Sequence, residues 1–228
     1  MIPINDTESN RYSFFPLMTL SLIIANCFIY FVEVFVVQSD YWVFFMKYAV
    51  TPLIILDAKG SGALSNITAL FLHGGLSHLL GNMLALWVFG RRVEDACGPW
   101  RFLAFYLLAG TFAHILFTVA QYNSPIPGIG ASGAIFGVMG AHLILYPGGR
   151  IRTLVFLSFV PVWPRIRAIW IVLYFVGIQV IPAIQTLLDK ADYSINHWAH
   201  LGGFFSAVFI LLFLRPEAFA RYLSDTSV

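Results

Sequence analysis

Six stretches of the chain are almost free of charged side chains, and this pattern constrains its fold more than any other feature. About 20 residues of helix cross the ~30 Å hydrocarbon core of a bilayer. Of the 228 residues, 59% are hydrophobic and 11% charged, which excludes an ordinary soluble domain. We therefore predict an all-α polytopic membrane protein, a bundle of six transmembrane helices. The predicted spans are about 14–37, 75–90, 102–122, 131–147, 168–188 and 197–214.

Two of these spans, 131–147 and 197–214, are short and rich in glycine, which favours helices packed inside the bundle. Two other apolar regions are predicted to lie at the membrane surface. Residues 153–164 are too short to cross and contain prolines, and the first loop, 39–74, mixes apolar segments with charges. The expected organisation is a cytoplasmic N-terminal tail (1–13), a membrane domain (14–214) and a cytoplasmic C-terminal tail (215–228).

The basic residues predict the orientation of the chain. They lie in short clusters beside the apolar stretches, so we interpret them as topology signals and not as a patch for an acidic partner such as nucleic acid. Ten fall on the N-terminal side of the membrane and three on the other, which predicts a multi-pass protein of the cell (inner) membrane with both termini cytoplasmic. No cleavable signal peptide is apparent. The ten are Arg11, Arg91, Arg92, Arg101, Arg150, Arg152, Arg165, Arg167, Arg215 and Arg221, and the three are Lys47, Lys59 and Lys190.

Polar side chains gather at the predicted outer ends of the second, fourth and sixth spans. His78 and Asn82 begin the second span, Ser132 begins the fourth and His200 begins the sixth. Ionisable groups inside a membrane are energetically expensive, so they mark functional sites. Because parallel helices that enter from one face place such groups at a matching depth, we expect these four residues to form a single site.

The pairing of a serine with a histidine suggests nucleophilic catalysis. A serine hydroxyl becomes a good nucleophile when a histidine within hydrogen-bond reach takes its proton. His200 shares a helix face with Gly203 and Ala207, so its imidazole lies on the face with the least bulk. The nearest carboxylate, Asp192, is predicted to lie outside the membrane. We therefore predict a dyad of Ser132 and His200 and not a triad.

The tetrahedral intermediate of acyl transfer also needs hydrogen-bond donors for its oxyanion. The available donors are the side chains of Asn82 and His78 and the backbone N–H of Ser132. Gly130 and Gly133 flank the serine and permit both a tight entry turn and a close helix approach. Helix packing alone would also account for a serine between glycines, and that alternative stays open for this segment taken by itself.

Several other polar residues are weaker candidates for this site. His197 lies one turn before His200 but shares its face with bulky side chains, which makes it the weaker base. Ser77 adjoins His78, yet neighbouring side chains on a helix diverge by roughly 100°. No carboxylate or thiol joins the histidines, so neither a metal nor another cofactor is predicted. Structural, packing or interfacial roles are predicted for His73, His114, His142 and Glu33, and Cys97 falls on the opposite side of the membrane.

Three motifs resemble those of the rhomboid family of intramembrane serine proteases. Phe136, four residues after the serine, also falls where that family carries an aromatic ring that stacks on the catalytic histidine. The resemblance covers roughly residues 14–214, including a stretch around Glu94 that we interpret as structural. The three motifs are Gly130-Ala131-Ser132-Gly133 (Gly-x-Ser-x), Ala199-His200-Leu201-Gly202-Gly203 (Ala-His) and His78-Leu79-Leu80-Gly81-Asn82 (His-x-x-x-Asn).

The resemblance implies a minimal six-helix prokaryotic rhomboid that cleaves single-span membrane proteins near the outer face, after a small residue. Substrate would enter laterally from the lipid bilayer, between the second and fifth helices. Two rival hypotheses are a catalytically inactive rhomboid-like protein that binds membrane helices for quality control, and a small transporter or channel. The first would lack the serine or the histidine. The second would show repeated halves, broken helices or buried charge pairs.

Overall fold

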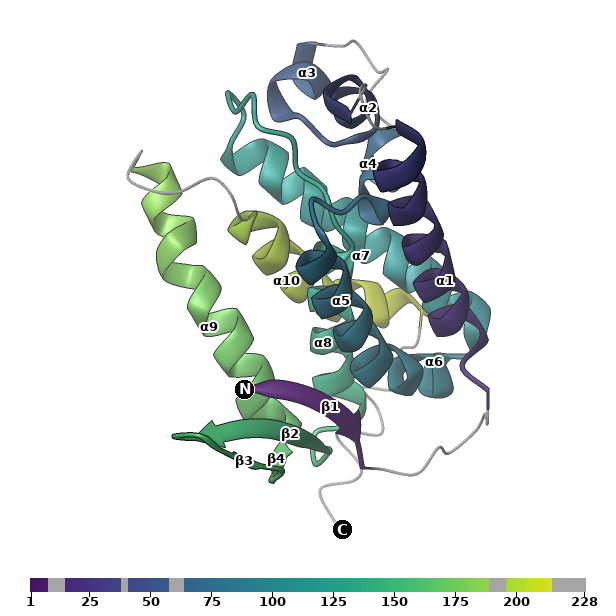
Figure 1. Cartoon of the computed structure of the whole chain (residues 1–228), viewed down its shortest axis with the longest axis vertical. Coiled ribbons are helices and arrows are strands. Elements are labelled where there is room, and N and C mark those ends of the chain that lie inside the picture. The colour runs from purple at the N-terminus through teal and green to yellow at the C-terminus, as the bar shows by residue number, and fades with distance from the viewer. Residues whose placement is uncertain (8–14, 38–40, 58–63, 189–195, 215–228) are drawn as a thin grey trace.

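The computed structural model describes residues 1–7, 15–37, 41–57, 64–188 and 196–214, and they are predominantly helical (Figure 1). Each predicted span contains a helix whose ends fall within a few residues of those expected from the apolar pattern. A π-helical turn, Glu33–Val37, extends the helix of the first predicted span, and another, Leu86–Gly90, ends the helical part of the second. The helices are α1 (Leu17–Val32), α5 (Leu76–Ala85), α6 (Arg91–Cys97), α7 (Pro99–Ala120), α8 (Ser132–Leu145), α9 (Ala168–Leu187) and α10 (His197–Leu214).

Helix length decides which segments can cross a membrane alone. Among the described residues, three helices are long and apolar enough: Leu17–Val37, α7 and α9. A fourth span is present if Ser65–Phe71, which contains α4 (Ser65–Thr68), is counted with Leu76–Cys97, although the two pieces meet at 95°. Helices α8 and α10 are shorter. The sequence predicted six spans, and by this measure the described structure contains three or four.

The predicted surface loop after α1 forms two short helices, α2 (Tyr41–Tyr48) and α3 (Pro52–Asp57). Both lie at the end of the bundle opposite the sheet (Figure 1). Trp42, Val43 and Leu56 are exposed on them. Exposed apolar side chains on short helices beside a bundle are typical of segments that rest in the membrane surface.

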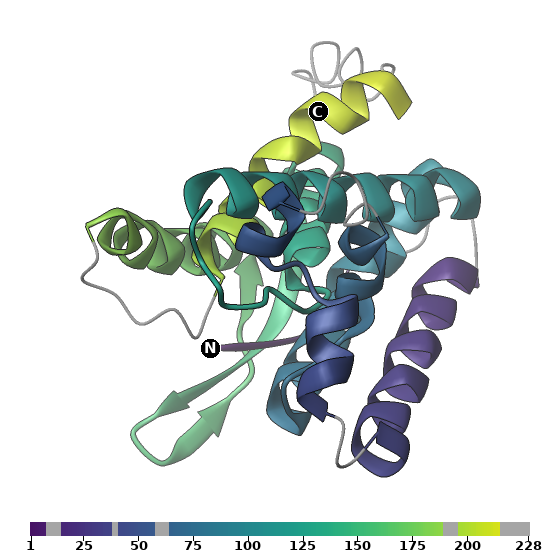
Figure 2. The same cartoon turned by 90° about the horizontal axis from the view of Figure 1, so that it is seen from above.

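Helix α8 lies at the centre of the bundle, packed against α7 and α10 (Figures 1 and 2). All residues from Gly133 to His142 are buried, which is why a helix that is apolar all round need not face lipid. Glycines bring α8 and α10 close together. A Cβ on Gly203 would overlap the carbonyl oxygen of Gly133, and one on Gly137 would lie 2.6 Å from Cβ of Ala109 on α7. The small-residue face of the sixth predicted span therefore packs on the glycines of the fourth.

A small sheet at the lower end of Figure 1 departs from the sequence prediction. The expectation of an all-α chain is wrong here, because 153–164 lies largely in a hairpin and the predicted tail 1–13 contributes a strand. Ile151 and Thr153 are buried while Arg150 and Arg152 are exposed, the period-two pattern of a half-buried strand. Strand β2 (Arg150–Leu157) pairs antiparallel with β1 (Ile2–Asp6), β3 (Val160–Val162) and β4 (Arg165–Arg167).

Asp6 connects strand β1 to α6 and α8 through contacts with Arg92 and His142. Its carboxylate accepts a hydrogen bond from Nε of Arg92 at 2.8 Å and lies 3.2 Å from Nε2 of His142. All three side chains are buried. Removal of Asp6 or Arg92 would leave an uncompensated charge in the protein interior, which is strongly destabilising. His142 therefore has a structural role, as the sequence predicted.

Glu94, on α6, forms hydrogen bonds with the first turn of α1. Its carboxylate accepts hydrogen bonds from the backbone N–H groups of Met18 and Thr19, both at 2.8 Å, and from the Thr19 hydroxyl at 2.7 Å. N–H groups in the first turn of a helix have no partner within that helix, and a carboxylate there also favours the helix dipole. Gly98, with φ of +84°, lets the chain turn from α6 into α7. The stretch around Glu94 is therefore structural.

Candidate active site

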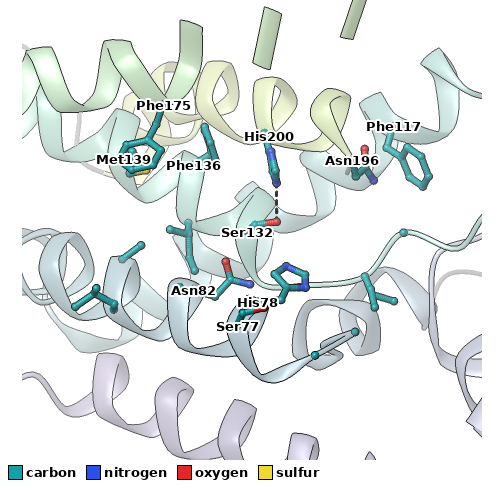
Figure 3. Close-up of a pocket in the computed structure, with 18 of the residues that line it drawn as sticks. Ser77, His78, Asn82, Phe117, Ser132, Phe136, Met139, Phe175, Asn196 and His200 are labelled. Carbon is teal, nitrogen blue, oxygen red and sulfur yellow. Dashed lines mark hydrogen bonds between the residues drawn. The ribbon is translucent and has the colours of Figure 1, made fainter. Parts of the chain in front are cut away.

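The crossing of α8 and α10 brings Ser132 and His200 into contact. Ser132 is the first residue of α8, and His200 lies in the first turn of α10. Nε2 of His200 lies 2.8 Å from Oγ of Ser132 (Figure 3). This is the distance of a hydrogen bond in which the hydroxyl donates to the ring nitrogen. The hydroxyl proton can therefore pass directly to the imidazole.

Gln179 on α9 holds the other ring nitrogen of His200, and sequence reasoning missed this residue. Nδ1 of His200 lies 2.9 Å from Oε1 of Gln179, whose amide nitrogen donates to the carbonyl oxygen of Phe175 at 3.2 Å. Because the second bond fixes the amide orientation, Oε1 accepts from Nδ1–H of the imidazole. His200 then presents the lone pair of Nε2 to Ser132. A buried glutamine within an apolar span was the available signal.

Two aromatic rings complete the surroundings of the imidazole. Phe136 stacks on His200 with ring centroids 4.5 Å apart and an angle of 8° between the planes. Nδ1 of His197 also bonds Oε1 of Gln179, at 2.6 Å, and its ring centroid lies 6.4 Å from that of His200. The imidazole of His200 is thus restrained on its face by Phe136 and at its edge by Gln179.

The two side chains predicted as oxyanion donors, Asn82 and His78 on α5, face Ser132 from the side opposite His200 (Figure 3). Nδ2 of Asn82 lies 2.9 Å from Nε2 of His73, a contact that uses one amide hydrogen and leaves the second free for another acceptor. Gly130 has a φ of +113°, and a Cβ there would lie 2.8 Å from the His78 ring. Both the backbone turn and the histidine therefore require glycine at this position.

Glu33 is buried and does not reach the membrane interface, so the prediction for this residue is wrong. Only 1% of it is exposed, and its carboxylate oxygens lie 3.2 and 3.3 Å from the backbone nitrogen of His73. The prediction assumed that the carboxylate needed water, but a backbone N–H replaces that water. Glu33 thereby holds the segment that carries His73, and His73 in turn contacts Asn82.

A cavity of about 810 Å³ lies beside these residues. Ser132, His200, His78 and Asn82 all line it. The cavity extends between α5 and α9 toward the sheet, and its walls there are largely apolar, as is typical of a binding site for an apolar ligand. Other residues of its lining are Leu84, Ala85, Met139, Phe175 and residues 1–3.

The remaining sequence candidates make other contacts. Ser77 lines the cavity, but within the described part of the chain it has no hydrogen bond to a histidine. Nδ1 of His114 lies 3.0 Å from the carbonyl oxygen of Asn66, and Cys97 is buried at the end of α6. Among the residues that the structure describes, no three histidine, cysteine or acidic side chains come close enough together to hold a metal ion.

Comparison with known proteins identifies the family of this chain. Residues 60–217 match the family model described as the Rhomboid domain. Rhomboid protease GluP of Bacillus subtilis is 49% identical over 84 residues, which are 37% of this chain and 16% of that protein. RHOMBOID-like protein 5 of Arabidopsis thaliana is 29% identical over 154 residues (66% and 44%). The matched regions span less than half the length of either relative.

The shared region contains the whole candidate site. The match to the rhomboid model includes α5, α8 and α10, the helices that carry Asn82, Ser132 and His200. A third relative, Rhomboid protein 1, mitochondrial, of Saccharomyces cerevisiae, is 34% identical over 119 residues, 50% of this chain and 33% of that protein. The rhomboid family model matches more than half of the chain, and three helices of the chain are long and apolar enough to cross a membrane. This chain is therefore an integral membrane protein of the rhomboid family.

Proposed function

We propose that this protein is an intramembrane serine endopeptidase with Ser132 as nucleophile and His200 as general base. The observation that carries the proposal is the 2.8 Å contact between Nε2 of His200 and Oγ of Ser132, beside a largely apolar cavity. A relative that matches part of the chain is named a rhomboid protease, which supports the same class of reaction.

The proposed reaction begins when His200 takes the hydroxyl proton of Ser132 and Oγ attacks the carbonyl carbon of the scissile peptide. The negative charge that develops on the carbonyl oxygen is stabilised by Asn82, His78 and the backbone N–H of Ser132. His200 then gives its proton to the leaving amine as the C–N bond breaks. Water, deprotonated by the same imidazole, hydrolyses the acyl-enzyme and restores the serine.

Gln179 has a positioning role in this proposal. An imidazole can act as a base toward Ser132 only when Nε2 is unprotonated, and the acceptor Oε1 of Gln179 keeps the proton on Nδ1. The same oxygen stabilises the imidazolium that forms when Nε2 of His200 takes the hydroxyl proton of Ser132. A neutral amide therefore does the orienting work that a carboxylate does in a triad.

The substrates that we propose are single-span transmembrane proteins, which enter laterally from the bilayer between α5 and α9, where the cavity lies. In this proposal six helices form the membrane bundle within 14–214, with α8 shielded from lipid by its neighbours. Both termini are cytoplasmic, the tails 1–13 and 215–228 included, and the membrane is the cell (inner) membrane. The candidate site then lies near the extracytoplasmic face.

Ser132→Ala and His200→Ala should each lower the rate of cleavage of a single-span substrate by at least about 1,000-fold, because either change leaves no activated nucleophile. The measurement is cleavage by purified protein in detergent, together with labelling by a fluorophosphonate. Ser206→Ala is the matched control, since it removes another buried hydroxyl, one that donates to the Gly203 carbonyl at 2.7 Å. Cleavage by pure Ser132→Ala would refute the assignment, and an unlabelled wild type would favour the inactive helix-binding hypothesis.

Gln179→Met should lower kcat by roughly 10- to 100-fold with little change in KM, because a hydrogen bond to a group that becomes charged is lost. Gln179→Glu keeps an acceptor and should recover part of that loss. Gln185→Met, at an exposed position on the same helix, is the matched control and should retain the wild-type rate. Equal rates for Gln179→Met and Gln185→Met would remove the positioning role.

Asn82→Ala should lower kcat on the order of 100-fold and raise KM much less, because an oxyanion donor acts mainly in the transition state. Asn26→Ala removes a different buried amide, which donates to the Leu22 carbonyl at 2.7 Å outside the cavity. This control should preserve kcat. A wild-type kcat for Asn82→Ala would leave Asn82 with a packing role only.

The proposed orientation places the loop after α7 outside the cell and the turn after α8 inside. Single cysteines at Asn123 and Gly148, both exposed, test it after Cys27 and Cys97 are replaced by alanine. In intact cells a membrane-impermeant maleimide should react with Asn123→Cys only, and with Gly148→Cys once the membrane is permeabilised. The reverse pattern would place Ser132 near the cytoplasmic face and require a different class of substrate.

A further inference from the structure

The outer face of the small sheet carries four arginines. In the antiparallel pairing of β2 with β4, Arg150 lies opposite Arg167 and Arg152 lies opposite Arg165. All four are exposed, whereas Ile151, which lies between Arg150 and Arg152 in β2, is fully buried. Side chains two residues apart on a strand point to the same face. The pairing therefore gathers four guanidinium groups on one surface of the sheet.

This arrangement is electrostatically unfavourable in isolation. Like charges that lie directly opposite one another destabilise a pair of strands. Within the described residues, Asp6 forms an ion pair with Arg92 and contacts His142, and no ion pair joins a carboxylate to the four arginines of the sheet. An anion held between two opposed arginines would replace their repulsion by attraction.

The hairpin beyond the arginines is apolar and exposed. Phe159 is 97% exposed, and Phe156, Leu157 and Val160 are exposed beside it. Figure 2 shows β2 and β3 projecting away from the helices. Because soluble surfaces rarely carry so many large apolar side chains together, the surroundings of this hairpin tip are themselves apolar.

The connection to α9 fixes the depth of the arginines in the membrane. Arg167 directly precedes Ala168, the first residue of a 20-residue helix that is apolar enough to cross a membrane. The guanidinium groups therefore lie where that helix leaves the hydrocarbon, at the depth of lipid headgroups. The 14 residues of α8 separate this surface from Ser132 by about 20 Å, so it is distinct from the candidate active site.

We infer that the arginine face of the sheet binds the headgroups of anionic phospholipids, while the hairpin tip inserts among the acyl chains of the same leaflet. A guanidinium group presents two parallel N–H donors that match a phosphate, and two opposed arginines can share one phosphate. Zwitterionic lipids carry an ammonium that offsets the phosphate charge, so anionic lipids are preferred. The sequence-based expectation that the basic residues form no patch is wrong at this surface, because strand pairing brings separate clusters together.

The test is native mass spectrometry of the delipidated full-length protein with equal concentrations of phosphatidylglycerol and phosphatidylcholine of matched acyl chains. Wild type should retain phosphatidylglycerol in preference. Arg165→Glu/Arg167→Glu should reduce that preference by at least about 25-fold, since each basic residue near an anionic leaflet contributes about fivefold. Lys47→Glu/Arg101→Glu, with the same change in net charge at two separate exposed sites, should keep the preference.

The charge reversal also has a stability readout that separates lipid binding from misfolding. Glutamates at 165 and 167 would face Arg152 and Arg150 across the strands, so the melting temperature in a neutral detergent should rise or stay constant. If this variant melts earlier, Arg165→Gln/Arg167→Gln gives the same lipid measurement with a smaller perturbation. A wild type without preference, a retained preference in the sheet variants, or an equal loss in the control would each overturn the inference.

Discussion

The backbone contact between α8 and α10 is the constraint on which the candidate site depends. A Cβ on Gly203 of α10 would overlap the carbonyl oxygen of Gly133 on α8, so Gly203 cannot carry a side chain, and Ser132 and His200 lie beside this contact. A displacement of about 1 Å between the helices is enough to break a hydrogen bond of 2.8 Å. The stacking of Phe136 on the imidazole and the bond from Gln179 act on an arrangement that the glycines have already fixed.

The positions of the helices could be predicted because apolar stretches report burial in lipid or protein directly. The number of spans could not, since α8 is apolar through burial by neighbouring helices whereas α10 also exposes Phe209 and Phe213, and hydropathy does not distinguish the two environments. The sheet was missed for a different reason. Strands β1 and β3 are short and each contains a proline, and β1 acquires its structure from a partner more than a hundred residues away. Long-range pairing of this kind leaves little trace in local sequence.

The polar residues of the site could be predicted in part, because a serine, a histidine and an asparagine at the ends of apolar stretches are conspicuous. Their neighbours were harder to identify. Gln179 is one neutral amide in a long span, and only the crossing of α9 with α10 shows that it contacts His200. The buried position of Glu33 depends on the backbone N–H of His73, 40 residues later. Partners of buried polar groups are set by tertiary packing, which a single sequence does not display.

Strand β1 can pair only after residues 150–157 have left the ribosome, because β2 is its partner. During the synthesis and membrane insertion of α1, α5 and α7, Ile2–Asp6 has no sheet to join. Closing a loop of this length is slow compared with local helix formation. Residues 1–3 also line the end of the cavity nearest the sheet. The end of the cavity nearest the sheet is therefore completed only after α8 and β2 have been synthesised, later than the walls that α5 and α7 contribute.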